Sequence, residues 1–217
     1  MAVIRILLLA LGLLLAPALP AQHAEQPMHR GFGGAERWSK IFDDPARDAW
    51  QKPEDVVRAL ALAPDASIAD IGAGTGYFAV RLARALPRGR VYGADIEPDM
   101  VRFLGERAAR EGLANLYAVQ ASQRAPNLPA PVDLALLVDT YHHVGQRVQY
   151  FTDLKQRLAP GGRVAIIDFR PDAAAGPPIQ HRIAPKTVAD EMARAGYRLA
   201  GEHAFLPNQY FLVFAPI

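Results

Sequence analysis

The sequence predicts an α/β fold in which helices cover both faces of a parallel sheet. Short apolar segments typical of buried strands alternate with amphipathic segments from Ser67 to Phe169. Parallel neighbours need a crossover connection, usually a helix, so this alternation favours a parallel sheet over hairpins. The 217 residues, 51% of them hydrophobic, suffice for one domain with a substantial core.

Individual elements can be placed along the chain. The strands of the parallel part are expected at Ser67–Ile71, Arg90–Ile96, Asn115–Gln120, Asp133–Asp139 and Arg163–Phe169. Helices are expected at Pro53–Ala61, Tyr77–Leu86, Asp99–Glu111, Val148–Leu158 and Thr187–Ala195. Prolines within residues 126–131 leave little room for a helix between the third and fourth strands. Two final strands, Tyr197–His203 and Gln209–Phe214, are joined by a short turn and should be antiparallel.

The N-terminus resembles a secretory signal peptide. Arg5 precedes an uninterrupted apolar run, Ile6–Leu15, and small residues and prolines follow. A membrane-spanning helix needs about 20 apolar residues, so cleavage between Ala18 and Ala24 is expected, with no stable membrane anchor afterwards. We therefore expect a signal peptide (1–21), an N-terminal extension (22–52), one domain (53–217) and a periplasmic location. Translation from Met28 would instead give a cytoplasmic protein.

Composition narrows the classes of function. The 24 basic and 22 acidic side chains give a net charge of +2, so no strong field attracts nucleic acid. The absence of cysteine excludes disulfides, thiolate metal sites and a cysteine nucleophile. The histidines show no metal-ligand spacing, and we expect no metal site. A small molecule is the expected partner, and the oligomeric state is not predicted.

The strongest motif is a glycine-rich turn, Asp70–Gly76, directly after a strand and before a helix. Its glycines permit positive φ angles and close backbone approach, and the helix N-terminus offers free amides to a ligand. Asp95 ends the next strand, where a carboxylate can accept hydrogen bonds from ribose hydroxyls. Together these features indicate a ligand that contains adenosine.

Two cofactors compete for this turn, because Gly74–Ala79 also satisfies the dinucleotide pattern of NAD-binding proteins. The second candidate is S-adenosylmethionine, and Asp70 favours it. A carboxylate repels a pyrophosphate but attracts a ligand that carries a sulfonium and an ammonium group. The sequence therefore favours S-adenosylmethionine over NAD.

The chain from about Pro53 onward resembles class I S-adenosylmethionine-dependent methyltransferases. Asp70–Gly76, Asp95, Leu158–Gly162 and the terminal strand pair carry the resemblance. It implies a Rossmann-like sheet of seven strands, parallel except for an antiparallel last strand. It also implies that the glycine turn holds the methionine part of the cofactor and that Asp95 holds the ribose.

The expected cofactor contacts are Asp70, Gly72, Ala73, Gly74, Gly76, Asp95, Ile96, Ser122 and Asp139. Ser122 stands where many members of this family carry an acid that accepts from the adenine amino group. Its hydroxyl can accept one hydrogen bond without a charge-assisted contribution, or backbone atoms and Ala121 can define the adenine pocket instead.

Catalysis is expected after the fourth strand, because ligands of open α/β sheets bind at the carboxyl ends of strands. Asp139, His142 and His143 are the candidate catalytic residues. Either histidine could act as a base near neutral pH, or the pair could merely close the loop. Tyr141, Asp168 and Arg170 are expected to face the substrate. Arg170 either binds an anionic group or forms a surface ion pair with Asp172.

The resemblance implies methyl transfer from S-adenosylmethionine, and the chain is most similar to small-molecule members. No Asn-Pro-Pro-Tyr-type sequence follows the fourth strand, which disfavours nucleobase or amide nitrogen as the acceptor. The acceptor atom itself is not predicted. The alternative is an exported cofactor-binding or regulatory protein without turnover, because S-adenosylmethionine is made in the cytoplasm.

Overall fold

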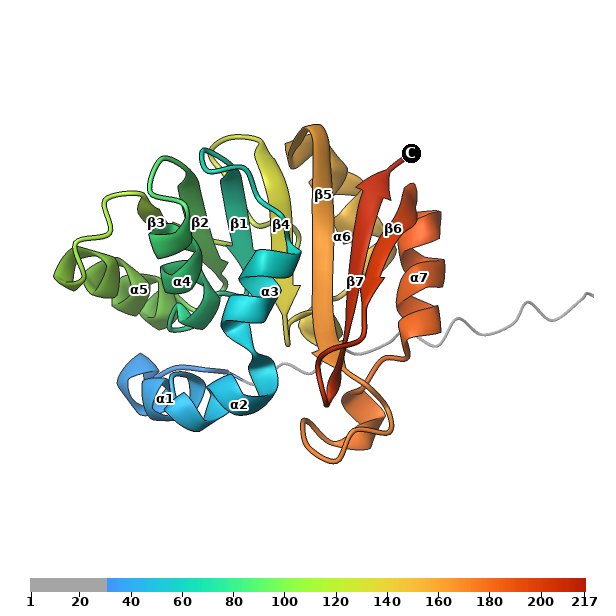
Figure 1. Ribbon diagram of the computed structural model, residues 1–217, viewed down its shortest axis with the longest axis horizontal. Coiled ribbons are helices and arrows are strands. Elements are labelled where there is room, and N and C mark those ends of the chain that lie inside the picture. Colours follow the sequence, from blue (N-terminus) through green and yellow to red (C-terminus); the bar gives the residue numbers. More distant parts are fainter. Residues whose placement is uncertain (1–30) are drawn as a thin grey trace, which may run out of the picture.

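The computed structural model describes residues 31–217 and centres on one seven-stranded sheet (Figure 1). The strand order is β3, β2, β1, β4, β5, β7, β6. The strands are β1 Ser67–Ile71, β2 Arg90–Asp95, β3 Leu116–Gln120, β4 Val132–Val138, β5 Leu158–Phe169, β6 Tyr197–His203 and β7 Gln209–Pro216. β1 to β5 pair in parallel, and β7 runs antiparallel between β5 and β6. The predicted Rossmann-like sheet is confirmed.

Helices cover both faces of this sheet. They are α1 Ala35–Phe42, α2 Asp48–Gln51, α3 Pro53–Ala59, α4 Tyr77–Ala85, α5 Pro98–Arg110, α6 Arg147–Leu154 and α7 Pro185–Arg194. The apolar sides of α3, α4 and α5 pack on one face, and those of α6 and α7 pack on the other (Figure 1). Along β1, Ile68 belongs to the first core and Ala69 to the second, because successive side chains of a strand point to opposite faces.

Some element bounds differ from those predicted. α3 stops at Ala59, because Ala61 takes a left-handed φ of 48° that ends the helix. α6 stops at Leu154 and a 3-10 turn follows, because Leu158 already pairs with Val132 and so begins β5. β4 ends at Val138, since Asp139 has a φ of 54° and leaves the strand. As expected, no helix separates β3 from β4.

The predicted N-terminal extension is described only in part. The predicted signal peptide, residues 1–21, and the alternative start at Met28 lie outside the described residues. Residues 32–52, here called the strap, form α1, a 3-10 turn at Pro45–Arg47 and α2. Within residues 31–217, no helix is both long and apolar enough to cross a membrane. The strap lies at the end of the sheet where the parallel strands finish (Figure 1).

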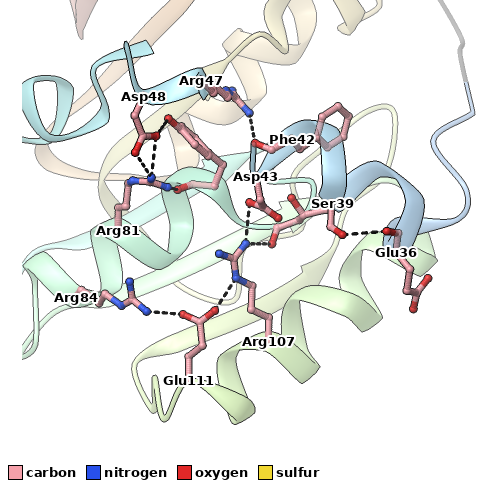
Figure 2. Close-up of polar contacts among 12 residues, drawn as sticks. Glu36, Ser39, Phe42, Asp43, Arg47, Asp48, Arg81, Arg84, Arg107 and Glu111 are labelled. Carbon is pink, nitrogen blue, oxygen red and sulfur yellow. Dashed lines mark hydrogen bonds and ion pairs between the residues drawn. The ribbon is translucent and has the colours of Figure 1, made fainter. Parts of the chain in front are cut away.

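Ion pairs attach the strap to α4 and α5 (Figure 2). Nη1 of Arg107 lies 2.9 Å from Asp43 of the strap and donates over the same distance to the carbonyl of Thr75 in the glycine turn. Nη2 of Arg81 lies 2.9 Å from Asp48. Arg107 and Asp43 are only 17% and 23% exposed, so this contact is screened less than an ordinary surface pair. Arg107 of α5 therefore bridges the strap and the predicted cofactor turn.

Candidate active site

The glycine turn is shaped by lack of space for side chains. Gly72 and Gly76 have φ angles of 75° and 95°, which residues other than glycine rarely adopt. A Cβ on Gly72 would lie 2.3 Å from Thr140 Oγ1, and one on Gly76 would lie 2.5 Å from Leu104. The turn can pass between β4 and α5 only because these positions have no side chain. Gly76 thus serves packing and does not line the cleft, contrary to its predicted role in cofactor contact.

Several N–H groups of the turn itself, ahead of α4, are already hydrogen-bonded within the protein. The N–H groups of Gly72 and Ala73 both donate to the carbonyl of Ala94, at 2.8 and 3.1 Å. The N–H of Gly74 donates to Asp95 Oδ2 at 2.8 Å. These donors are used inside the protein, because the turn folds against the end of β2. Gly72 and Gly74 nevertheless line the cleft, so a ligand can still approach the backbone there.

Asp95 joins the turn to the end of β2. Its two carboxylate oxygens accept the N–H groups of Gly74 and Glu97, at 2.8 and 2.9 Å. A carboxylate has about four lone-pair directions, so acceptor capacity remains for a diol. Burial raises the pKa of Asp95, although these backbone hydrogen bonds oppose the change. The carboxylate is held rigidly where the ribose was predicted.

Asp70 is a buried carboxyl group at the end of β1, only 3% exposed. Burial raises its pKa to about 7, while the backbone N–H of Ala79 in α4 lowers it. The charge of Arg47 also lowers this pKa but does not offset the effect of burial, so the buried carboxylate is costly and a cationic ligand would relieve that cost. This site therefore fits the sulfonium and ammonium groups of S-adenosylmethionine.

Asp139 is the second carboxyl group of the same cleft. Its Oδ1 accepts a hydrogen bond from Gln209 Nε2, and its Oδ2 lies 3.4 Å from Arg47 Nη2. Burial raises its pKa to about 7, the charge of Arg47 lowers it, and Asp168 raises it. The left-handed backbone at Asp139, which follows its exit from β4, places the carboxyl group in the cleft.

His142 and Asp168 form a buried pair. Nδ1 of His142 lies 2.9 Å from each carboxylate oxygen of Asp168, and the Asp168 carboxylate also accepts the His142 backbone N–H at 3.2 Å. Burial by itself lowers the pKa of His142, but the Asp168 hydrogen bond and the charges of Asp168 and Asp139 raise it above 6.5. With Nδ1 donating to Asp168, Nε2 is the ring nitrogen that can accept a proton.

His143 lies beside this pair and has a different setting. The ring centroids of His142 and His143 are 4.1 Å apart, and Phe32 of the strap packs on His143 edge-on at 5.7 Å. Both histidines line the cleft. His142 has a buried carboxylate partner, Asp168, that fixes its ring in the orientation a base requires.

None of the three predicted substrate residues is among those that line the cleft. The Tyr141 ring is fully buried, and its hydroxyl donates to Glu191 at 2.5 Å. Asp168 lies behind His142 and reaches the cleft only through that ring. Arg170 donates to the carbonyls of Leu206 and Gln209, each at 3.1 Å, and so braces the turn before β7. Its expected alternative partner, Asp172, lies 3.4 Å away.

The remaining predicted cofactor residues also line the cleft: Ala73, Ile96 and Ser122. Ser122 Oγ accepts the N–H of Ala125 at 3.1 Å and donates to the carbonyl of Ala125 at 3.2 Å, so it shapes its own turn. Ile96 is 47% exposed and offers an apolar surface there. This arrangement favours a pocket defined by backbone and apolar contacts.

The sequence analysis missed the residues that the strap contributes. Phe32, Ile41, Phe42, Arg47 and Trp50 all line the cleft. A Cβ on Gly74 would lie 3.5 Å from the Phe42 ring, so the strap rests on the glycine turn. The only signal in the sequence was the aromatic content ahead of the first strand, which does not indicate where those rings pack.

The cleft enclosed in this way has a volume of about 1930 Å³. Pockets for single small ligands usually measure about 300–1,000 Å³. It extends from Asp95 past Asp70 and Asp139 to His142, then on to α6 and α7. One continuous space therefore has room for a cofactor and an acceptor.

Comparisons with known proteins agree with this geometry. Residues 68–162 match the methyltransferase domain family. This match covers less than half of the chain. It is 27% identical over 116 residues to the demethylmenaquinone methyltransferase of Deinococcus radiodurans, covering 54% of this chain and 48% of that protein. It is 35% identical over 115 residues to the ubiquinone/menaquinone biosynthesis C-methyltransferase of Syntrophotalea carbinolica, covering 52% and 48%. The aligned part spans about half the length of these curated relatives.

Solved structures support the fold. A methyltransferase from Aquifex aeolicus that depends on S-adenosylmethionine superposes with a TM-score of 0.78 and 23% identity, covering 84% of this chain and 98% of its own. Magnesium protoporphyrin IX methyltransferase from Synechocystis, solved with S-adenosylhomocysteine bound, has a TM-score of 0.65 and 18% identity, covering 85% and 94%. The match to the methyltransferase family and the buried acid at Asp70 together indicate S-adenosylmethionine as the cofactor.

Proposed function

We propose that this protein transfers a methyl group from S-adenosylmethionine to a small molecule whose hydroxyl, phenol or protonated amine loses a proton to His142. The His142–Asp168 pair carries this proposal. The imidazole side chain is 4% exposed, lines the cleft and has its Nδ1 fixed by a carboxylate. A base that is oriented in this way matches the requirement of proton removal during methyl transfer.

Each part of the site has a role in this reaction. When bound, S-adenosylmethionine supplies a methyl group on a sulfonium and leaves as a neutral thioether. Asp70 and Asp139 balance the positive charge at that end of the cleft. The acceptor atom forms the new bond to carbon, and its proton passes to Nε2 of His142. Asp168 stabilises the imidazolium that results.

The wall of the cleft favours an acceptor with an apolar or aromatic body. Ile41, Trp50, Tyr150 and Phe169 line it, and the rings of Trp50 and Phe169 are 5.7 Å apart. Aromatic walls bind planar apolar groups well. The relatives do not narrow the choice, since their names cite acceptors as different as demethylmenaquinone and trans-aconitate.

The first experiment is calorimetric titration of the purified protein with S-adenosylmethionine, S-adenosylhomocysteine and NAD. We expect the first two to bind and NAD not to bind. The second experiment measures S-adenosylhomocysteine release with a panel of phenols, carboxylic acids and amines, and compares wild type with His142→Gln. Preferential binding of NAD would overturn the proposal. Cofactor binding without turnover on any acceptor would instead favour the regulatory protein.

We also propose that the protein is exported, on the basis of the apolar run in residues 6–15 and the small residues that follow it. Mass spectrometry of the native N-terminus tests this proposal. A terminus between residues 18 and 25 is expected. A chain that begins at Met1 or Met28 would place the protein in the cytoplasm, where the cofactor is made.

A further inference from the structure

Arg47 reaches the cleft from the strap, outside the part of the chain that matches the methyltransferase domain. Its guanidinium lies 4.0 Å from the centre of the Tyr77 ring. It also donates to the carbonyl of Phe42 at 3.0 Å and to Gln51 Oε1 at 3.2 Å. The side chain is only 15% exposed. These contacts hold the guanidinium in a defined position beside the glycine turn.

Arg47 belongs to the end of the cleft that contains two carboxyl groups. Its Nη2 lies 3.4 Å from Asp139 Oδ2, and its charge lowers the pKa of both Asp139 and Asp70. Asp95, by contrast, is bonded to Gly74 and Glu97. The guanidinium therefore lies beside Asp139, at the predicted methionyl end of the cofactor.

The methionyl end of S-adenosylmethionine carries a carboxylate as well as an ammonium group. Asp70 and Asp139 suit the cationic groups but would repel the ligand's carboxylate. A guanidinium has five N–H donors, and within residues 31–217 three of those of Arg47 have a partner: Phe42, Gln51 and Asp139. Two donors are left for an anion.

We propose that Arg47 binds the carboxylate of the cofactor's methionyl end and thereby selects ligands that possess this group. The assignment rests on the proposed use of S-adenosylmethionine. Arg147 also lines the cleft, but Glu191 lies 2.7 and 3.0 Å from two of its nitrogens. Arg47 is the better candidate, because its guanidinium lies 3.4 Å from Asp139 and lines the same cleft as Asp70.

The test compares S-adenosylmethionine with decarboxylated S-adenosylmethionine, which keeps the adenosine, sulfonium and ammonium groups. Calorimetry on the wild-type protein should show about 10- to 100-fold tighter binding of the carboxylated ligand, as for the loss of a charge-assisted hydrogen bond. In Arg47→Met, which keeps the aliphatic stem, the two affinities should differ by less than about 3-fold, which is near the spread of such measurements.

Arg81 provides a matched control. It packs on the same Tyr77 ring at 4.1 Å and pairs with Asp48 of the strap, yet it does not line the cleft. Arg81→Met should weaken the attachment of the strap and keep the wild-type ratio of the two affinities. Thermal unfolding of both variants shows whether each is folded. If Arg47→Met does not fold, Arg47→Lys replaces it and should give a reduced ratio.

Three results separate the two proposals. A ratio near one in the wild type, or an unchanged ratio in the Arg47 variant, overturns the role of Arg47 and leaves the proposed function standing. Binding of neither ligand to the wild type overturns the cofactor assignment itself. If Arg81→Met also binds the two ligands with equal affinity, the preference for the carboxylated ligand depends on the strap as a whole. That result would overturn the specific role of Arg47.

Discussion

Asp70→Asn should stabilise the cofactor-free protein at alkaline pH and weaken cofactor binding. The pKa of Asp70 is about 7 in the folded protein against an ordinary value of 3.8. Between these values the folded state binds more protons than the unfolded state, so the free energy of unfolding falls as pH rises through this window. Asn keeps an acceptor for the N–H of Ala79 but cannot ionise.

The size of the effect follows from the same values. A pKa of about 7 in place of 3.8 corresponds to roughly 4 kcal/mol above pH 7. Because Asp70 is 3% exposed, solvent does little to screen this cost. We therefore expect Asp70→Asn to be more stable than wild type by roughly 1–4 kcal/mol at pH 8, and by much less at pH 4.5. Its affinity for S-adenosylmethionine should fall about 10- to 100-fold.

Urea unfolding, followed by tryptophan fluorescence, at pH 4.5 and 8 measures the first effect, and calorimetry measures the second. Asp172→Asn is the control, since its side chain is 82% exposed and should give no pH-dependent gain. An Asp70→Asn variant whose stability relative to wild type is the same at both pH values would refute the argument. Unchanged cofactor affinity would show that the cation is held elsewhere.

Other predictions follow from the site. Asp95→Ala should weaken S-adenosylmethionine by roughly 1–3 kcal/mol in calorimetry, because hydrogen bonds to a charged acceptor are lost; unchanged affinity would place the ribose elsewhere. Gly72→Ala should lower the free energy of unfolding more than Gly161→Ala does, since both have φ near 75–79° but only Gly72 lacks space for a Cβ. His142→Gln should reduce turnover on an identified acceptor by about 10²–10⁴ while cofactor binding persists. In Asp168→Asn, NMR titration should show a lower pKa for His142 than in wild type, because the charge of Asp168 and its hydrogen bond raise that pKa. An unchanged pKa would show that Asp168 does not stabilise the protonated imidazole.

Much of the fold could be predicted from the sequence because its signals are local. The alternation of apolar and amphipathic segments located every strand core, and the short connection after His203 indicated the antiparallel final pair. Bounds shifted where pairing partners decided them, as at Leu158, which joins β5 through Val132. A strand end depends on a neighbour that may be distant in sequence, so local pattern alone does not fix it.

The cofactor end of the site was also visible in the sequence. Glycine spacing and the acids Asp70 and Asp95 reflect local geometry, because each follows directly from a strand end. The use made of the turn was not visible: the amides of Gly72 and Gly74 are already bonded to the end of β2. That outcome depends on how the turn folds against its neighbouring strand.

The acceptor side was decided by tertiary structure. Tyr141, Asp168 and Arg170 lie near strand ends in sequence, yet burial or carbonyl contacts turn all three away from the cleft. The carboxylate that orients His142 comes from β5, and the sequence did not show that Asp168 packs against this ring. Arg47 became part of the site because ion pairs to α4 and α5 hold the strap across the strand ends (Figure 2). The direction of a side chain, and its contacts with residues far away in the sequence, depend on tertiary packing. The sequence pattern shows only periodicity and local turns.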